Sequence, residues 1–253
     1  MTTKTMINQF ARTEQLLGPR ALDTLKRSRI SIFGLGAVGS FAAEALARTG
    51  IGQMHLVDFD RVDASNINRQ LFALHSTIGM EKSVVAQSRI KDINPGCHVT
   101  IQSSFVNADS LADLLEPDMD IIVDAIDGLN AKVNLLVEAR KMGLAVVSSM
   151  GAGGRIDISQ IKTGDISQTH VCPLARMVRQ RLHRRGIYEG IAAVYSTEKP
   201  LNKQPFKSDD VSDPLENHGR PRPPIGTVPY VTGAFGLYIA MEVVRILTES
   251  RER

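Results

Sequence analysis

Two groups of residues in the first quarter of the chain have the types and spacing needed to hold a nucleotide. Gly34, Gly36 and Gly39 form a G-x-G-x-x-G run, which lets the backbone turn tightly and aim N–H groups at phosphate. Asp58 and Asp60 follow at about 20 residues, the spacing at which a carboxylate meets ribose hydroxyls. Together they predict a bound nucleotide without saying which one.

A polar cluster directly after the acidic pair favours ATP over a nicotinamide cofactor. Arg69 offers a planar guanidinium to phosphate oxygens, and Lys82, at the start of a predicted helix, offers a point charge. With the glycine turn they predict a triphosphate clamp, because nucleotidyl transfer depends on positioning and charge neutralisation. The amides expected beside them are Asn66, Asn68 and Gln70.

Two further carboxylates follow a predicted strand of apolar residues, at the end where α/β sheets place their ligands. We assign Asp127 to Mg²⁺ on the phosphates, since that ion prefers a few carboxylates together with phosphate and water. Asp124 is expected to anchor the turn after the strand. A purely structural role for Asp127 stays open.

These residues lie at the ends of strands that alternate with helices along the first 154 residues. Strands are predicted at 29–33, 54–57, 99–101, 120–123 and 145–149, and helices at 40–49, 81–93, 110–115 and 130–141. Such alternation predicts an α/β fold with a Rossmann-like, mainly parallel sheet flanked by helices.

The pattern changes after residue 154 into a C-terminal extension. Short strands are predicted at 156–161 and 194–196, an arginine-rich helix at 174–185 and a long Pro-rich loop at 199–229. A final amphipathic helix at 231–247 is short and carries charges, so no stable membrane insertion is expected, although peripheral membrane association stays open. We expect a single domain over 1–253, with an ATP-binding core at 10–154 and a substrate-facing extension at 155–253.

Composition narrows the class of protein. The net charge of +3 permits a polyanionic partner without requiring one. The two cysteines, Cys97 and Cys172, cannot build a disulfide framework or a C-x-x-C zinc pair, and the N-terminus lacks a cleavable signal. We therefore expect a cytoplasmic protein.

These motifs resemble the ATP-binding domain of the ubiquitin-activating-enzyme-like superfamily, which includes the MoeB/ThiF-like adenylyltransferases. The resemblance rests on GLGAVGSFAAEALARTGIG, DFDRVDASNINRQ, Lys82 and DAIDG. Such enzymes are typically homodimers that adenylate a carboxylate with Mg-ATP. The resemblance implies that Asp58 and Asp60 contact ribose, Arg69 and Lys82 contact phosphate, and Asp127 holds the metal.

The same resemblance gives a role to an arginine near the N-terminus. In these dimers such an arginine reaches the ATP of the partner subunit, and FART at 10–13 looks like that segment. Arg12 is thus a candidate arginine finger in trans. The alternative is an ordinary surface arginine.

The second half of the chain resembles the tRNA threonylcarbamoyladenosine dehydratase family. That resemblance rests on GAGGRID at 151–157, DISQT at 165–169, PLA at 173–175 and VYSTE at 194–198, together with the missing zinc pairs. It implies ATP-dependent cyclisation of N6-threonylcarbamoyladenosine next to the anticodon. A nitrogen of the modified base would attack the acyl-adenylate, so no catalytic cysteine is needed. Cys172 departs from the acidic residue common in that family, and we expect it to be structural.

A tRNA substrate would give the arginine-rich helix the role of contacting RNA phosphates. Its arginines are Arg176, Arg179, Arg181, Arg184 and Arg185. Three alternatives stay open: an adenylyltransferase for a ubiquitin-like sulfur-carrier protein, an NAD-dependent oxidoreductase, and a non-catalytic tRNA- or membrane-associated module. A sulfur-transfer or relay protein is a further candidate partner.

Overall fold

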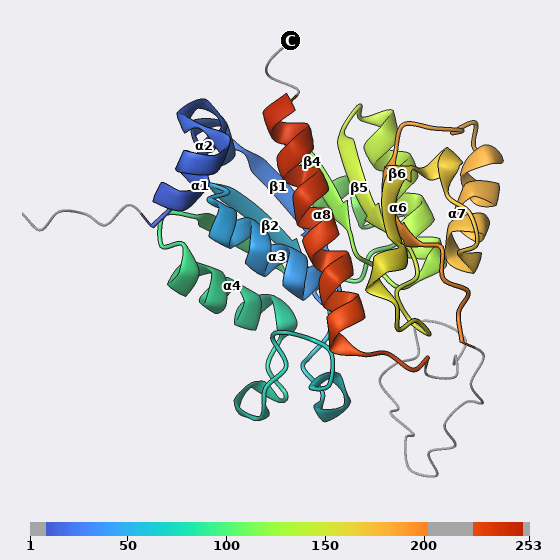
Figure 1. Ribbon diagram of the computed structural model, residues 1–253, viewed down its shortest axis with the longest axis horizontal. Helices are drawn as coiled ribbons and strands as arrows, with labels where there is room; N and C mark the ends of the chain where they lie inside the picture. Colours follow the sequence, from blue (N-terminus) through green and yellow to red (C-terminus); the bar gives the residue numbers. More distant parts are fainter. Residues whose placement is uncertain (1–8, 202–224, 250–253) are drawn as a thin grey trace, which may run out of the picture.

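A seven-stranded sheet crosses the centre of the molecule in the order β3-β2-β1-β4-β5-β7-β6 (Figure 1). This computed structural model describes residues 9–201 and 225–249. The strands are β1 (Arg29–Phe33), β2 (Gln53–Val57), β3 (His98–Gln102), β4 (Ile121–Asp124), β5 (Ala145–Ser149), β6 (Ile161–Asp165) and β7 (Ala192–Ser196). Neighbouring strands are parallel except β6 and β7, which are antiparallel. The expected Rossmann-like sheet is confirmed.

Helices cover both faces of the sheet and enclose two hydrophobic clusters. One face carries α2 (Pro19–Arg27), α3 (Gly39–Thr49), α4 (Lys82–Ile93) and α8 (Pro229–Glu249), and the other carries α5 (Leu111–Leu114), α6 (Leu129–Lys141) and α7 (Pro173–His183). The central strands β1 and β4 are mostly apolar, and every residue in them except Arg29 is buried, as expected for parallel strands covered on both faces.

The strand order reverses direction between β1 and β4, which creates the switch point where such sheets bind ligands. Two glycines make the turn there possible. Gly34 has φ +91°, and a Cβ on it would lie 2.7 Å from the Ala125 carbonyl oxygen. A Cβ on Gly39 would lie 1.8 Å from the Gly34 carbonyl oxygen. The loops after β1 and β4 therefore pack directly against each other.

The long helix α8 packs on α3, and the backbones of the two helices approach each other closely. A Cβ on Gly236 would lie 2.6 Å from the carbonyl oxygen of Val38, the residue that precedes α3. The described residues include one helix, α8, that is long and apolar enough to cross a membrane, and 56% of its most apolar window is buried in the protein. Its burial against α3 and the sheet is what a core helix would show.

The structure corrects one predicted element and adds two. The strand predicted at 156–161 is wrong: Ile158–Gln160 is a 3-10 helix, and β6 begins at Ile161. Asp157 initiates that helix by accepting hydrogen bonds from the Ser159 N–H and the Gln160 amide, so the segment turns. The sequence patterns predict neither α1 (Ala11–Leu17) nor α2, and the structure adds both. Most of the predicted loop at 199–229 lies outside the described residues.

Candidate nucleotide and substrate site

Asp58 ties the glycine turn to the loop after β2. Its Oδ2 accepts a 2.6 Å hydrogen bond from the Leu35 N–H, and its Oδ1 accepts one of 2.8 Å from the Asp60 N–H. The side chain is buried, and this burial raises the pKa of Asp58, although the nearby charge of Lys82 opposes the shift. Asp58 thus shapes the loops that would surround a ribose, and a direct ribose contact stays a prediction.

Lys82 and Asp60 form an ion pair at the same edge of the sheet. Lys82 Nζ lies 2.7 Å from Asp60 Oδ2, with the lysine side chain 6% exposed and the aspartate 44% exposed. An ammonium group has three N–H donors, so this contact leaves donors for a phosphate. The structure therefore brings these two predicted site residues together.

The polar loop after β2 is held by its own side chains. Asn66 Oδ1 accepts from the Asp63 N–H at 3.3 Å, which closes the 3-10 turn Ala64–Asn66. Arg69 Nη1 donates to the Ser65 carbonyl oxygen at 2.7 Å and to Asn68 Oδ1 at 2.8 Å. Asn66 is thus used in shaping the loop, while Arg69 lies at its surface. Their contacts with a nucleotide stay predictions.

The space above Gly36 is open, unlike that at the other two glycines of the turn. Among the described residues, the nearest atom to a Cβ built on Gly36 is Gln70 Nε2, at 3.8 Å. The fold alone therefore tolerates a side chain at this position. An open turn with an amide at its rim is what a phosphate group would require.

Asp124 and Asp127 differ sharply in environment. Asp124 Oδ2 accepts from Lys132 Nζ and Ser148 Oγ, both at 2.6 Å, and Oδ1 accepts from the Ile126 N–H. Its predicted anchoring role is confirmed. Asp127 is exposed, and the part of the chain that is described holds no group of three or more His, Cys, Asp or Glu able to bind a metal. A single carboxylate suits Mg²⁺ only when phosphates complete its shell, so Asp127 fits that ion together with ATP.

Arg12 lies far from this site within one chain. Phe10, just before α1, packs against Gly50 at the carboxyl end of α3, with its ring 3.4 Å from the ideal Cβ position. The glycine turn lies at the opposite end of α3, and a helix of 11 residues is about 16 Å long. The structure therefore does not bring the exposed Arg12 to the nucleotide site of its own chain.

The arginines of the predicted RNA-binding helix divide into three groups. Arg179 donates to the Thr169 carbonyl oxygen and hydroxyl, so it fastens the loop before α7. Arg181 and Arg185 instead contact Asn130 and Asn134 of α6. Arg176 and Arg184 are exposed.

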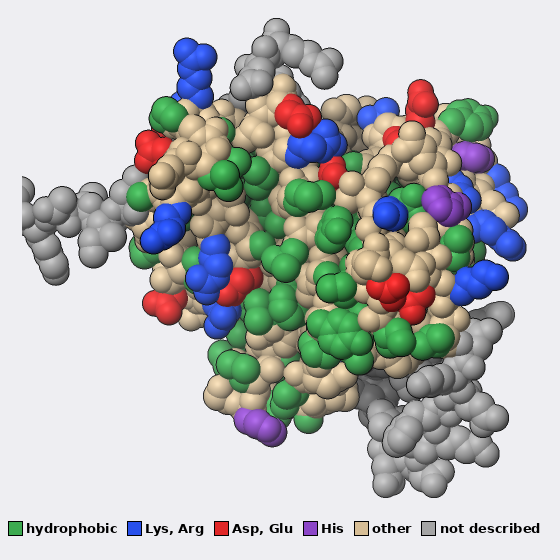
Figure 2. All heavy atoms as spheres, viewed as in Figure 1, with side chains coloured by type: hydrophobic (Ala, Val, Ile, Leu, Met, Phe, Trp, Pro, Cys, Tyr) green, Lys and Arg blue, Asp and Glu red, His purple; other side chains and the backbone are tan. Residues whose placement is uncertain are grey.

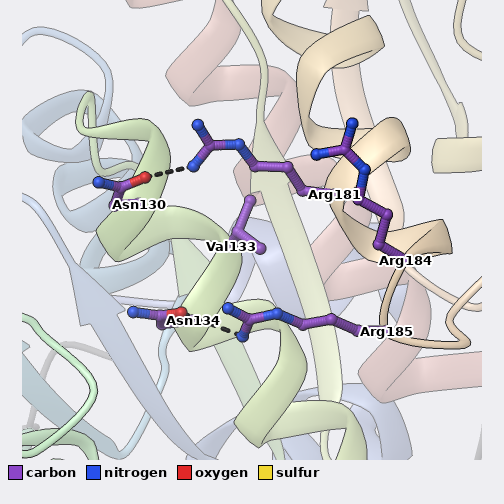
Figure 3. A pocket seen from close by; sticks show the side chains of 6 residues that line it. All are labelled: Asn130, Val133, Asn134, Arg181, Arg184 and Arg185. Carbon is purple, nitrogen blue, oxygen red and sulfur yellow. Dashed lines mark hydrogen bonds between the residues drawn. The ribbon is translucent and has the colours of Figure 1, made fainter.

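A basic groove runs between α6 and α7. It encloses about 370 Å³, and the side chains of α7 reach toward those of α6 across it (Figure 3). Lys and Arg side chains also gather at the edge of the molecule where α7 lies (Figure 2). The lining residues of this α6–α7 groove are Asn130, Val133, Asn134, Arg181, Arg184 and Arg185.

Sequence reasoning missed residues whose importance depends on three-dimensional contacts. Phe59, between the two aspartates, packs edge-to-face on Phe105 with ring centroids 5.1 Å apart, after β2 and β3 respectively. Arg155 is buried in the loop after β5. A lone aromatic or arginine in a turn has no diagnostic spacing, so neither gives a signal in the sequence.

Comparison with known proteins covers nearly the whole chain. A ThiF family profile matches residues 10–253. The tRNA threonylcarbamoyladenosine dehydratase of Bacillus subtilis is 37% identical over 98% of this chain and 97% of its own length, and that of Escherichia coli is 40% identical over 75% and 74%. Two crystal structures of Escherichia coli tRNA N6-threonylcarbamoyladenosine dehydratase also match this chain over 97% of its length and 96% of theirs. The complex with AMP has a TM-score of 0.86 at 33% identity, and the complex with ATP has a TM-score of 0.85 at 34% identity. The chain therefore belongs to the ThiF family.

Proposed function

We propose that this protein is an ATP-dependent tRNA threonylcarbamoyladenosine dehydratase. It adenylates the carboxylate of N6-threonylcarbamoyladenosine next to the anticodon, and the side chain then closes into a ring with net loss of water. The observation that carries this proposal is the end-to-end similarity to dehydratases, one of them solved with ATP and with AMP. The open glycine turn with its polar rim supports it from the geometry.

The nucleotide site uses the carboxyl ends of β2, β1 and β4. Backbone N–H groups of the glycine turn and the start of α3 face the phosphates, and the loops shaped by Asp58 and Asp60 receive the ribose. Arg69, Gln70 and Lys82 bind the phosphate oxygens. Asp127 would hold Mg²⁺, which supplies charge neutralisation on the phosphates when bound.

The chemistry needs no protein nucleophile. A carboxylate oxygen of the substrate attacks the α-phosphorus of ATP, and pyrophosphate leaves with the electrons of the broken P–O bond. A nitrogen of the same modified base then attacks the activated carbonyl carbon and gives up its proton, and AMP leaves with the original carboxylate oxygen. Because the two reacting groups are already joined, their effective concentration is high.

Two features connect this site to partners. The α6–α7 groove and Arg176 provide cations for tRNA phosphates, and α6, which lines this groove, packs against β4 and β5. In a homodimer, Arg12 would serve the partner's ATP, and its distance from its own site supports that use. The cytoplasmic location, the division of the domain at residue 154 and a relay protein remain predictions.

Mass spectrometry of tRNA nucleosides tests the proposal directly. tRNA carrying threonylcarbamoyladenosine is incubated with ATP and the protein, and digested under conditions that preserve the labile ring. We expect the cyclic nucleoside and one AMP for each ring, with the exposed Arg27→Ala variant behaving as wild type. Uncyclised nucleoside overturns the proposal. ATP–pyrophosphate exchange with a carrier protein instead of tRNA would favour the sulfur-carrier alternative, and tight NAD binding would favour the oxidoreductase.

A further inference from the structure

We propose that Arg155 and the amino end of α7 form an anion subsite that receives the substrate carboxylate before it is adenylated. The identity of that carboxylate rests on the proposed function. The existence of the subsite rests on the structure alone, through a buried cation that has an unused edge.

Arg155 is 4% exposed, and its guanidinium is only partly satisfied. Nη1 donates to the Gly153 carbonyl oxygen at 2.9 Å, whereas Nε and Nη2 are buried with no hydrogen-bond partner in the described structure. A buried charge without a partner is costly, so proteins rarely keep one unless it has a use. Nε and Nη2 share one edge of the guanidinium, and that edge matches the two oxygens of a carboxylate or phosphate.

The amino end of α7 is the second feature near Arg155. Cys172 is the N-cap residue, and its side chain makes no capping hydrogen bond with the described residues. The first helical hydrogen bond runs from the Arg176 N–H to the Cys172 carbonyl oxygen at 3.1 Å, so the N–H groups of Leu174 and Ala175 come before it. Free N–H groups and the helix dipole favour an anion at this end.

Both features lie close to Gly151, two residues after the end of β5. A Cβ on this glycine would lie 3.5 Å from Arg155 Nη1, 3.6 Å from Cys172 Sγ and 3.7 Å from Leu174 Cβ. Nη1 of Arg155 and the first residues of α7 therefore surround one point near the carboxyl edge of the sheet, and the unpartnered Nε and Nη2 belong to the same guanidinium. Because Nε and Nη2 are enclosed, an anion reaches them only when neighbouring side chains shift.

The loop that leads into α7 is strained. Val171 has φ +64°, which is unfavourable for a β-branched residue, and the Cys172 N–H bonds to the His170 carbonyl oxygen at 2.7 Å across it. Backbone strain of this kind persists only where packing holds it, and it gathers at ligand sites. Here the strained Val171 fixes the position of Cys172, the N-cap residue of α7.

The position of Arg155 along the sheet favours a carboxylate over a nucleotide phosphate. The glycine turn follows β1 and Gly151 follows β5, with β4 between them, so roughly 10 Å separates the two loops at the usual strand spacing. Thr227 lies between the loop after β2 and the loop after β5: its carbonyl oxygen accepts from Asn68 Nδ2 at 3.4 Å, and its methyl group lies 3.4 Å from the ideal Cβ of Gly153. In the proposed site, ATP occupies the loops after β2 and β1. Arg155, in the loop after β5, is therefore placed to bind the carboxylate that reacts with ATP.

Calorimetry with a small acid and its matched amide tests the subsite. The probes are N-carbamoyl-L-threonine and N-carbamoyl-L-threoninamide, added to the full chain with a non-hydrolysable ATP analogue. We expect the wild-type protein and an Arg27→Met control to prefer the acid by roughly tenfold or more, the range of hydrogen bonds to charged groups. Arg155→Met should lose this preference, and Arg155→Lys should keep part of it. An unchanged preference in Arg155→Met overturns the subsite.

Two further readouts and a fallback variant separate the explanations. In the first, Arg155→Met binds the ATP analogue more weakly while keeping its preference for the acid. That result would assign the Nε and Nη2 edge of Arg155 to a nucleotide phosphate and overturn the carboxylate assignment. Acid preference in a wild-type protein that forms no cyclic nucleoside would refute the proposed function and leave the subsite standing. If Arg155→Met does not fold, Arg155→Gln, which retains a donor toward Gly153, replaces it in the same comparison.

Discussion

The Lys82 ammonium lies 2.7 Å from Asp60 Oδ2, and the Lys82 N–H donates to the Asp60 carbonyl oxygen at 3.0 Å. The start of α4 is therefore fastened to the loop after β2 by both backbone and side chain. The lysine side chain is almost wholly buried, whereas the aspartate faces outward. A cation fixed in this way needs little rearrangement to meet a phosphate, which is the arrangement that nucleotidyl transfer favours.

Removing one member of this pair should cost more than removing both. Asp60→Asn removes the carboxylate that bonds the buried Lys82 ammonium and leaves only the more distant Asp58 as a counter-charge, and we expect the free energy of unfolding to fall by about 1–3 kcal/mol. Urea unfolding of Asp60→Asn, Lys82→Met and the double variant measures the coupling. Losses that simply add in the double variant would show that the ion pair contributes nothing of its own. Lys82→Met and the double variant should also lose AMP formation, because both lack the ammonium group expected to bind phosphate.

The three glycines of the phosphate turn should respond differently to alanine. Gly39→Ala places a methyl group 1.8 Å from the Gly34 carbonyl oxygen, so we expect it to unfold or to lose several kcal/mol of stability, on the order of an overpacked core site. Gly36→Ala meets open space and should fold with nearly wild-type thermal stability. It should nevertheless weaken ATP binding, because the methyl group occupies the position expected for phosphate. Thermal unfolding with and without ATP distinguishes the two, and normal ATP stabilisation of Gly36→Ala would contradict the assignment.

The α6–α7 groove should contribute to the salt dependence of tRNA binding. Arg184→Ala and Arg185→Ala should each reduce the slope of log K against log salt by about 1 for every phosphate contact that is lost. ATP binding should remain unchanged, since among the described residues both side chains line the groove with α6 rather than the nucleotide loops. Filter binding at several salt concentrations, with Arg27→Ala as the control, makes the measurement. Equal slopes for all variants would place the RNA elsewhere.

Asp165 should make the extension sensitive to acid. Burial acts to raise the pKa of Asp165, but hydrogen bonds from Ser167 and from the Gly190 and Ile191 N–H groups outweigh it and lower the pKa. A lowered folded-state pKa means that the stabilisation is present at neutral pH and disappears as the pH falls through the folded-state value. Asp165→Asn should therefore lose about 1–2 kcal/mol of unfolding free energy at pH 7, the usual range for such bonds.

The pH dependence of this loss is the test. The gap between Asp165→Asn and the wild-type protein should begin to narrow below about pH 4, where the carboxylate of the unfolded chain is protonated, and should close once the pH falls below the lowered folded-state pKa. Urea unfolding across this range measures it, with Asp113→Asn, at an exposed position, as the matched control. A gap that stays constant from neutral pH into acid would mean that the charge of Asp165 does not matter.

Local patterns predicted the sheet and its ligand edge, because they depend on residues close together in sequence. The glycine turn, Asp58 and Asp124 each follow an apolar strand directly, so their place at the carboxyl edge could be inferred. The apolar residues of the 156–161 segment suggested a strand. The prediction failed because Asp157 accepts hydrogen bonds from the Ser159 N–H and the Gln160 side-chain amide, which turns the backbone.

Residues whose role depends on distant partners could not be predicted in this way. The sequence treats the arginines of α7 alike, yet Arg179 is committed to Thr169 while Arg184 is exposed. Arg155 stands out only because two of its nitrogens lack a partner, and no sequence pattern records a missing contact. The distance of Arg12 from the glycine turn likewise follows from the direction of α3.

The contact between Gly236 and Val38 also bears on how the protein is made. Val38 belongs to the phosphate turn near the start of the chain, whereas Gly236 lies in α8, which is synthesised last among the described helices. A growing chain therefore holds the complete nucleotide motif long before it has the helix that supports it. Until α8 emerges from the ribosome, the apolar surface of α3 lacks its cover, and exposed surface of that kind promotes aggregation. The earliest motif in the sequence thus becomes one of the last parts of the structure to be finished.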